Sequence, residues 1–230
     1  TTLFRSDVDG IALIPPIYGW LERGSGCVAA MDDTGVDVYG ADGESLMYSV
    51  PGAGLEAALA GDFVAVYEDG RTRLYDLEGK IAFDSESRVD FAAGLDGQVI
   101  ASDGGWGESC AWLMNPDGSA ASGRFQRILP LASGRYAWLT MQGIEYYSAD
   151  LDRVQTSWNY ESLRYGLMDA AGNALTPAEY LEIRTLGEHR LLMVSEEGVY
   201  LADLDGGVIR SWLNPQTEAA TGEAGGGSTG

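Results

Sequence analysis

The residues of this chain with the clearest capacity for chemistry are acidic side chains in a recurring turn. The turn has the form Asp-x-Asp/Glu-Gly and occurs at 7–10, 76–79 and 203–206, with looser copies ending at positions 43, 118, 151 and 172. Carboxylates beside a glycine bend are oxygen ligands that Ca²⁺ prefers. A calcium loop needs further ligands, yet Asp205 is followed by Gly206, Gly207 and Val208. We therefore interpret the turns chiefly as hairpin devices and keep a calcium-stabilised structural module as an alternative.

Other catalytic arrangements find little support. The chain has 35 acidic residues, so a carboxylate pair for glycoside hydrolysis is available, and a carbohydrate-active hydrolase remains an alternative. The single histidine, His189, lies in a turn and is expected to face solvent, which argues against a Ser-His-Asp site. Cys27 and Cys110 lie far apart in the sequence, without metal-ligand spacing, and their pairing stays open. We assign no catalytic residue, no metal ligand and no cofactor.

A loop that breaks the repeat is the better candidate for binding. Residues 101–109, ASDGGWGES, replace a two-residue hairpin turn with a longer glycine-rich segment. Loops that depart from a regular scaffold are where binding tends to reside. We predict that Trp106, Glu108 and Asp103 contact a ligand, with Trp106 as an exposed anchor.

Composition excludes several classes of function. The net charge of -21 repels nucleic acid and anionic membrane surfaces. No apolar run approaches the roughly 18 residues of a membrane span, so none is expected in this chain. The sequence starts with Thr1 rather than Met, which suggests a processed or truncated product. We expect one domain over 1–213 and a flexible Gly/Thr/Ala-rich tail or linker over 214–230.

The acidic turns recur within a larger repeat of short strands. Their closing positions are 10, 43, 79, 118, 151, 172 and 206, and all intervals except that from 151 to 172 are similar in length. Such a period is typical of propellers and related arrays. Each unit has a strongly apolar strand, expected to be innermost, then a tight turn ending in glycine and a second strand. The acidic turn follows, and a third strand then carries an aromatic.

The distance from the turn glycine to this aromatic is nearly constant along the chain. The glycines and aromatics of the pattern are Gly35, Gly70, Gly143 and Gly198 with Tyr48, Phe83, Trp158 and Trp212. The aromatics are expected to pack between neighbouring sheets.

A weaker segment before each apolar strand supplies a fourth strand, which makes the unit similar to a propeller blade. Full units are predicted over 16–50, 54–86, 88–122, 125–158 and 179–212. Residues 55–60, LEAALA, are predicted to be a loop or a short turn.

Two half units share the pattern Gly-x-Ala-Leu-x-Pro-x-x-Tyr. It runs from Gly10 to Tyr18 and from Gly172 to Tyr180. The halves could complete one blade together, or the first could be the remnant of a separate blade. The fold predicted is an all-β, β-propeller-like array of antiparallel three- to four-stranded units, with about six blades and five or seven as alternatives.

The second half unit, with its preceding residues, resembles the repeat of WG-repeat (KWG) proteins. Tyr165-Gly166-Leu167-Met168-Asp169, Gly172, Pro177 and Tyr180 match that repeat, with tyrosine in place of its first tryptophan. The segments at 144–158 and 199–212 are more similar to quinoprotein-like propeller repeats. The resemblance implies a bacterial, repeat-built β domain and no established activity.

Together these features predict a non-catalytic binding or scaffolding module of an exported bacterial protein, outside the cell or in its envelope. Its expected partners are proteins or glycans.

Overall fold

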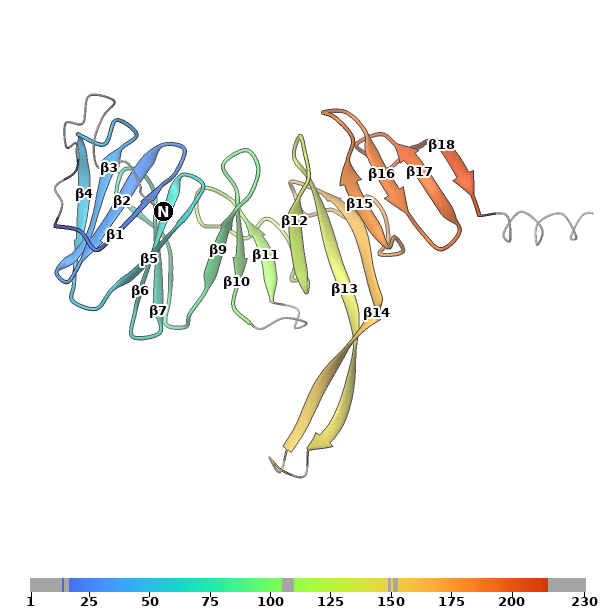
Figure 1. The fold of residues 1–230 in the computed structure, drawn as a ribbon, viewed down its shortest axis with the longest axis horizontal. Helices are drawn as coiled ribbons and strands as arrows, with labels where there is room; N and C mark the ends of the chain where they lie inside the picture. The colour runs from blue at the N-terminus through green and yellow to red at the C-terminus, as the bar shows by residue number, and fades with distance from the viewer. Residues whose placement is uncertain (1–13, 15–16, 105–109, 149, 151–152, 215–230) are drawn as a thin grey trace, which may run out of the picture. The chain divides into compact units, whose positions relative to one another are not determined.

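A computed structural model of the chain describes residues 14, 17–104, 110–148, 150 and 153–214. These residues form β-strands and no α-helix, and the strands pair antiparallel in five sheets of three or four strands (Figure 1). The prediction of an all-β, propeller-like array of such units is confirmed. Within the described ranges, no helix is long and apolar enough to span a membrane. The chain divides into two compact units, residues 1–105 with 110–123, and residues 106–109 with 124–230.

The first unit holds three sheets. The first sheet has the strand order β1 (Trp20–Arg23), β2 (Cys27–Asp32), β3 (Gly35–Gly40), β4 (Leu46–Pro51). The second has the order β5 (Glu56–Ala60), β6 (Phe63–Glu68), β7 (Arg71–Tyr75), β8 (Ile81–Ser85). The third is β9 (Asp90–Ala93), β10 (Val99–Ser102), β11 (Ala111–Met114).

The second unit holds two sheets. The fourth sheet is β12 (Arg127–Pro130), β13 (Arg135–Ser148), β14 (Arg153–Asp169). The fifth is β15 (Glu182–Thr185), β16 (Leu191–Val194), β17 (Gly198–Ala202), β18 (Val208–Leu213). Every sheet is therefore a meander in which sequential strands are neighbours.

We predicted that the apolar strands of the repeat would be innermost. They are instead the second strands of their sheets. β2, for example, pairs with β1 on one edge and β3 on the other. The strand that precedes each apolar strand forms the sheet edge, and the edge strand β5 contacts β9 of the next sheet. Apolar residues suit the second position because neighbouring strands flank it on both edges and packed side chains cover both of its faces.

Residues 55–60 are a second correction, since Glu56–Ala60 is the strand β5 rather than a loop or turn. It pairs with β6 along its whole length, from Glu56 opposite Tyr67 to Ala60 opposite Phe63. Its alanines favour a helix intrinsically, but pairing to a buried neighbour outweighs a weak local propensity in so short a segment.

The acidic turns are hairpin devices, as interpreted. In two of the closest copies, one carboxylate oxygen of the leading aspartate accepts two backbone N–H groups. Asp76 accepts those of Glu78 and Lys80 at 3.1 and 2.7 Å. Asp203 accepts those of Asp205 and Gly207 at 3.0 and 2.8 Å. These oxygens already satisfy the backbone of the turn.

Backbone conformation and close packing both require the glycine of the acidic turn. Gly79, Gly118 and Gly206 have φ of 78°, 85° and 84°, in the left-handed region. Each also lies against another part of its own unit. A Cβ on Gly118 would lie 1.8 Å from the Ala82 carbonyl oxygen, and one on Gly206 would lie 2.6 Å from the Thr176 side chain.

Third-strand aromatics pack between sheets in the first unit, as predicted. Tyr48 of β4 lies 6.1 Å from Tyr75 of the second sheet, between ring centroids. Phe83 of β8 lies 5.7 Å from Phe91 of the third sheet. Trp212, at the matching place in the fifth sheet, is 47% exposed.

The fourth unit departs most from its prediction. Gly143 ends no turn but lies within β13, opposite Trp158 of β14. The two strands pair out to Ser148 opposite Arg153, and Trp158 lies in the part of β14 that extends beyond the strand pairing with β12. Residues 165–180 instead complete the fourth sheet, because β14 runs to Asp169 and Ala174 bridges back to Met168. Residues 1–13, which hold most of the first half unit, lie outside the described ranges, so the joining of the two half units in one blade and the number of six blades both stay predictions.

The remaining candidates for chemistry are the two cysteines, the histidine and clusters of metal-ligating side chains. Cys27 and Cys110 are both buried and are not joined in a disulfide, and His189 lies exposed between β15 and β16, as expected. The described ranges hold no group of three or more His, Cys, Asp or Glu side chains that could ligate a metal.

Candidate functional site

The predicted ligand-binding residues belong to the connection between β10 and β11. Asp103 is exposed and follows β10 directly, and its backbone N–H donates to the Cys110 carbonyl at 3.3 Å. Trp106 and Glu108 lie outside the described residues, so the predicted site stays a prediction. In the first, second and fifth sheets a tight turn occupies this position between the second and third strands.

The fourth sheet carries a much larger insertion at the same place in the repeat. β13 and β14 pair from Arg135 opposite Asp169 out to Ser148 opposite Arg153. Only their inner parts belong to the sheet with β12, and their outer parts continue beyond it as a two-stranded ribbon (Figure 1). We call residues 141–163 the arm. It lies where the repeat loses its regular spacing, around the short interval from 151 to 172.

A bulge lies at the base of the arm. Thr140 pairs with Arg164, and the next pair outward is Gln142 with Asn159, so Met141 faces four residues of β14. Ser162 holds this irregularity, because its hydroxyl accepts the Gln142 N–H at 2.8 Å and donates to the Asn159 carbonyl at 2.6 Å. Bulges bend the strand that carries them and redirect the chain beyond them. The arm therefore leaves its sheet in a fixed direction.

The arm exposes apolar side chains next to a packed aromatic. Ile144 is 55% exposed and Tyr160 is 65% exposed. Trp158 covers Gly143 on the facing strand, where an added Cβ would lie 3.1 Å from the indole ring. The tryptophan thus shields a glycine that offers no side chain of its own, while Ile144 and Tyr160 remain available for contact.

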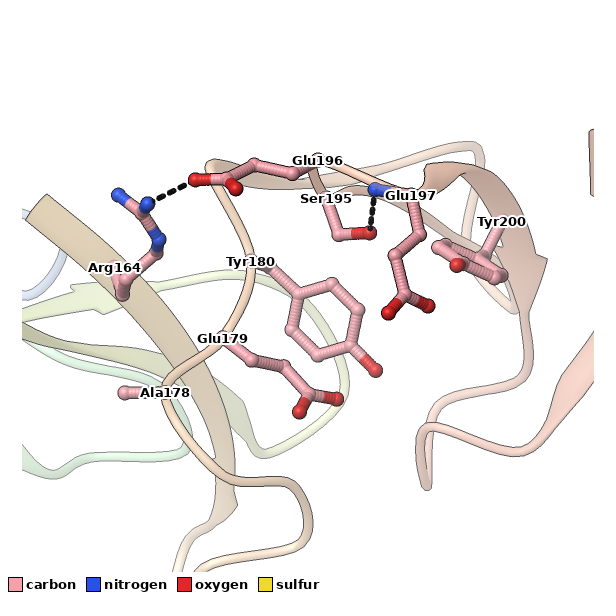
Figure 2. Close-up of a pocket in the computed structure, with 8 residues that line it drawn as sticks. All are labelled: Arg164, Ala178, Glu179, Tyr180, Ser195, Glu196, Glu197 and Tyr200. Carbon is pink, nitrogen blue, oxygen red and sulfur yellow. Dashed lines mark hydrogen bonds and ion pairs between the residues drawn. The ribbon is translucent and has the colours of Figure 1, made fainter. Parts of the chain in front are cut away.

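A hollow of about 510 Å³ lies at the arm's base, within the second unit. Its lining comes from β14, from the segment before β15, from the β16–β17 hairpin and from β17 (Figure 2). The lining residues are Arg164, Ala178, Glu179, Tyr180, Ser195, Glu196, Glu197 and Tyr200. We call it the base hollow.

The base hollow is acidic with an aromatic wall. Arg164, 24% exposed, forms an ion pair with Glu196, which is 72% exposed. Tyr180 and Tyr200 pack edge to face, with ring centroids 6.3 Å apart. Figure 2 shows the Glu197 carboxylate between these rings in the view and the Glu179 carboxylate near the Tyr180 hydroxyl.

Tyr180 is a neutral hydrogen-bond donor over the physiological range. Burial is the largest cause that raises its pKa to about 12, and the hydrogen bond to Glu179 acts in the same direction. The residue is only 8% exposed. Its backbone is fixed by two hydrogen bonds with Tyr165, at 2.7 and 3.1 Å. The hollow can therefore bind cations and hydrogen-bonding groups on a rigid wall.

Sequence reasoning missed the base hollow because three separated segments build it. The one available signal was the shared Gly-to-Tyr pattern, which ends at Tyr180 and at Tyr18. The hydrolase alternative, which needs two carboxylates at a defined separation in a deep pocket, stays a prediction.

Comparisons with known proteins give a likeness of fold only. No protein-family model matches the chain, and no curated protein matches it. Kluyveromyces lactis Hsv2 is 12% identical, with a TM-score of 0.37 over 84% of this chain and 62% of that one. The WD40 domain of SCAP from fission yeast is 12% identical, with a TM-score of 0.39 over 86% and 56%. BamB from Moraxella catarrhalis is 13% identical, with a TM-score of 0.32 over 82% and 73%. The chain thus spans less than two thirds of these Hsv2 and SCAP chains.

Proposed function

We propose that this chain is a non-catalytic protein-binding module of an exported bacterial protein, acting outside the cell or in its envelope. In this proposal the arm and the base hollow contact one protein partner. The loop with Asp103, Trp106 and Glu108 is a second contact region, because it interrupts the same position of the repeat one sheet earlier.

The arm is the observation that carries the proposal. The second sheet joins its second and third strands with only Asp69 and Gly70. In the fourth sheet the whole segment 141–163 occupies that position. A two-stranded ribbon is marginal in water and adds little to the stability of the sheet below it. It does present Ile144 and Tyr160 to solvent, as expected of a surface that a partner covers.

Charge indicates which partners fit. With a net charge of -21 the chain attracts basic protein surfaces over roughly a Debye length and speeds their encounter. The same charge disfavours nucleic acid and anionic lipid.

A glycan is the second candidate partner. The observation that favours it is the wall of Tyr180 and Tyr200 beside carboxylate acceptors in the base hollow. Aromatic faces combined with hydrogen-bonding groups at a concave site suit a sugar ring.

The test removes the arm without disturbing its sheet. Thr140 and Arg164 are directly paired, as are Glu68 and Arg71 at the ends of the tight turn of the second sheet. Joining Thr140 to Arg164 through Asp-Gly, the dipeptide of 69–70, deletes the arm and keeps the inner strands in register. Asp69 and Gly70 both have positive φ, which matches a two-residue hairpin turn.

Wild-type protein and the arm-trimmed variant are then applied to a random peptide array and a glycan array. The proposal predicts peptide binding by the wild type that falls at least tenfold in the variant, while the thermal unfolding transition stays cooperative. Trp106→Ala serves as a variant of the second contact region and is expected to weaken binding less. Equal peptide binding by wild type and arm-trimmed protein would refute the proposal. Arm-independent binding confined to glycans would favour the second candidate.

A further inference from the structure

We infer that the base hollow binds an arginine side chain of the partner. This inference rests on the proposed function and specifies what the hollow recognises. The hollow carries three glutamates and one arginine, and Arg164 is already paired with Glu196. Among the described residues, Glu197 forms no ion pair, and Glu179 accepts a hydrogen bond from Tyr180. Two carboxylates therefore face the hollow without a cation to balance them.

The aromatic wall favours a guanidinium over a compact ammonium. A guanidinium is planar, stacks on aromatic rings and donates in a fork that matches a carboxylate. The rings of Tyr180 and Tyr200 both line the hollow and meet at 81°. Glu197 comes from the hairpin beside Tyr200, and Figure 2 shows its carboxylate directed toward that space. A guanidinium placed there would meet a ring and a carboxylate together.

The wall of the hollow is ordered before any ligand arrives. The Ser195 N–H donates to the Gly198 carbonyl at 2.9 Å, and the Glu197 N–H donates to the Ser195 hydroxyl at 3.0 Å. Tyr180 is held by its two backbone hydrogen bonds with Tyr165. A site fixed in this way loses little conformational entropy on binding. The volume of about 510 Å³ also falls within the range of ligand pockets.

The hollow and the arm meet at Arg164. This residue lines the hollow and is paired with Thr140, the last pair before the arm begins. A partner segment lying along the arm therefore reaches the hollow without crossing another sheet. One arginine at the end of such a segment would bridge the apolar contact at Ile144 and Tyr160 to the acidic contact at the base.

The test uses the whole chain and three small probes. The probes are acetyl-Gly-Gly-Arg-Gly-Gly-amide and the same peptide with citrulline or lysine in place of arginine. Citrulline keeps the shape of arginine but lacks the charge. Binding is followed by NMR titration on wild type, Glu197→Gln and Glu179→Gln. Glu188→Gln is the matched control, because it makes the same charge change at an exposed position in the turn between β15 and β16.

The inference predicts saturable binding of the arginine peptide with shifts at Tyr180 and Tyr200. Affinity should fall at least fivefold for citrulline and for Glu197→Gln, and stay within twofold for Glu188→Gln. Lysine should bind more weakly than arginine. The inference is wrong if citrulline or lysine binds as well as arginine, or if Glu188→Gln weakens binding as much as Glu197→Gln. Failure here with arm-dependent binding on the peptide array overturns only the arginine site, whereas loss of arm dependence overturns the proposed function.

Discussion

Tyr180 packs edge to face against Tyr200, and Tyr18, which ends the other copy of its sequence pattern, packs edge to face against a tyrosine at a different strand position. The two rings lie 6.3 Å apart at 81°, and Tyr18 lies 6.2 Å from Tyr39 at 78°. In the first unit the Tyr18 hydroxyl donates directly to Asp37. Asp37 and Tyr200 are at equivalent positions, because each lies two residues after the glycine that starts its strand, β3 or β17. The same repeat thus yields a closed contact in one copy and an open hollow in the other.

Tyrosine ionisation should make stability fall at high pH. The pKa of Tyr180 rises from 10.0 to about 12 on folding, so the folded state holds its proton more tightly. The resulting stabilisation is complete below pH 10 and is lost as the pH rises toward 12. We expect the melting temperature of Tyr180→Phe to fall less than that of wild type over this alkaline range. Tyr160→Phe, at an exposed position, should follow the wild type, and a Tyr180→Phe curve parallel to wild type would contradict the assignment.

Two buried tyrosine hydroxyls should respond oppositely to removal. The Tyr18 hydroxyl contacts Asp37 and the Tyr39 hydroxyl, whereas the buried Tyr48 hydroxyl has no hydrogen-bond partner among the described residues. Removing the first leaves polar partners unsatisfied, so Tyr18→Phe should lower the free energy of unfolding by about 1 to 2 kcal/mol. Tyr48→Phe should leave it unchanged or raise it by up to about 1 kcal/mol. Urea unfolding measures both, and a larger loss at Tyr48 than at Tyr18 would be inconsistent with this packing.

The acidic turns should depend on an oxygen acceptor rather than on a negative charge. Asp203 holds two backbone N–H groups through one oxygen, which asparagine also offers. We expect Asp203→Ala to lower the free energy of unfolding by about 1 kcal/mol and Asp203→Asn to change it by less than half as much. Millimolar calcium should leave the melting temperature of wild type unchanged. A calcium-dependent rise that Asp203→Asn abolishes would revive the calcium alternative.

Aromatic residues at matching positions of the repeat should contribute unequally to the free energy of unfolding. Phe83 packs on Phe91 and lies 6.5 Å from Trp112 of the next sheet, whereas Trp212 contacts Arg210 of its own strand. Phe83→Ala should therefore cost about 2 to 3 kcal/mol of unfolding free energy. Trp212→Ala should cost below about 1 kcal/mol. Denaturant titration of both variants checks this order, which a costlier Trp212→Ala would reverse.

Local chemistry explains why much of the fold was predictable. An aspartate and a glycine at fixed offsets specify a turn through hydrogen bonds between near neighbours, so the acidic turns and the strands around them could be located. The reason for Gly166, in contrast, is a contact between strands, because a Cβ on this residue would lie 2.4 Å from the Trp138 ring on the facing strand. The prediction for residues 55–60 was wrong because pairing with β6, not local propensity, decides their conformation.

The candidate site could not be predicted for a different reason. Gly143 matched the turn glycines in type and spacing, but β13 continues through it because β14 supplies partners along its whole length. The base hollow depends on how the fourth and fifth sheets pack, which brings Arg164, Tyr180 and Glu197 together from separate segments of the sequence. Only the short spacing between positions 151 and 172 marked the insertion.

Peptide-array binding by the folded arm-trimmed variant tests the central claim most directly. If the arm is the partner-contacting element, the variant with Asp-Gly between Thr140 and Arg164 should unfold cooperatively and lose at least nine tenths of the wild-type peptide signal. A cooperatively folded variant that retains the wild-type peptide signal would contradict the account.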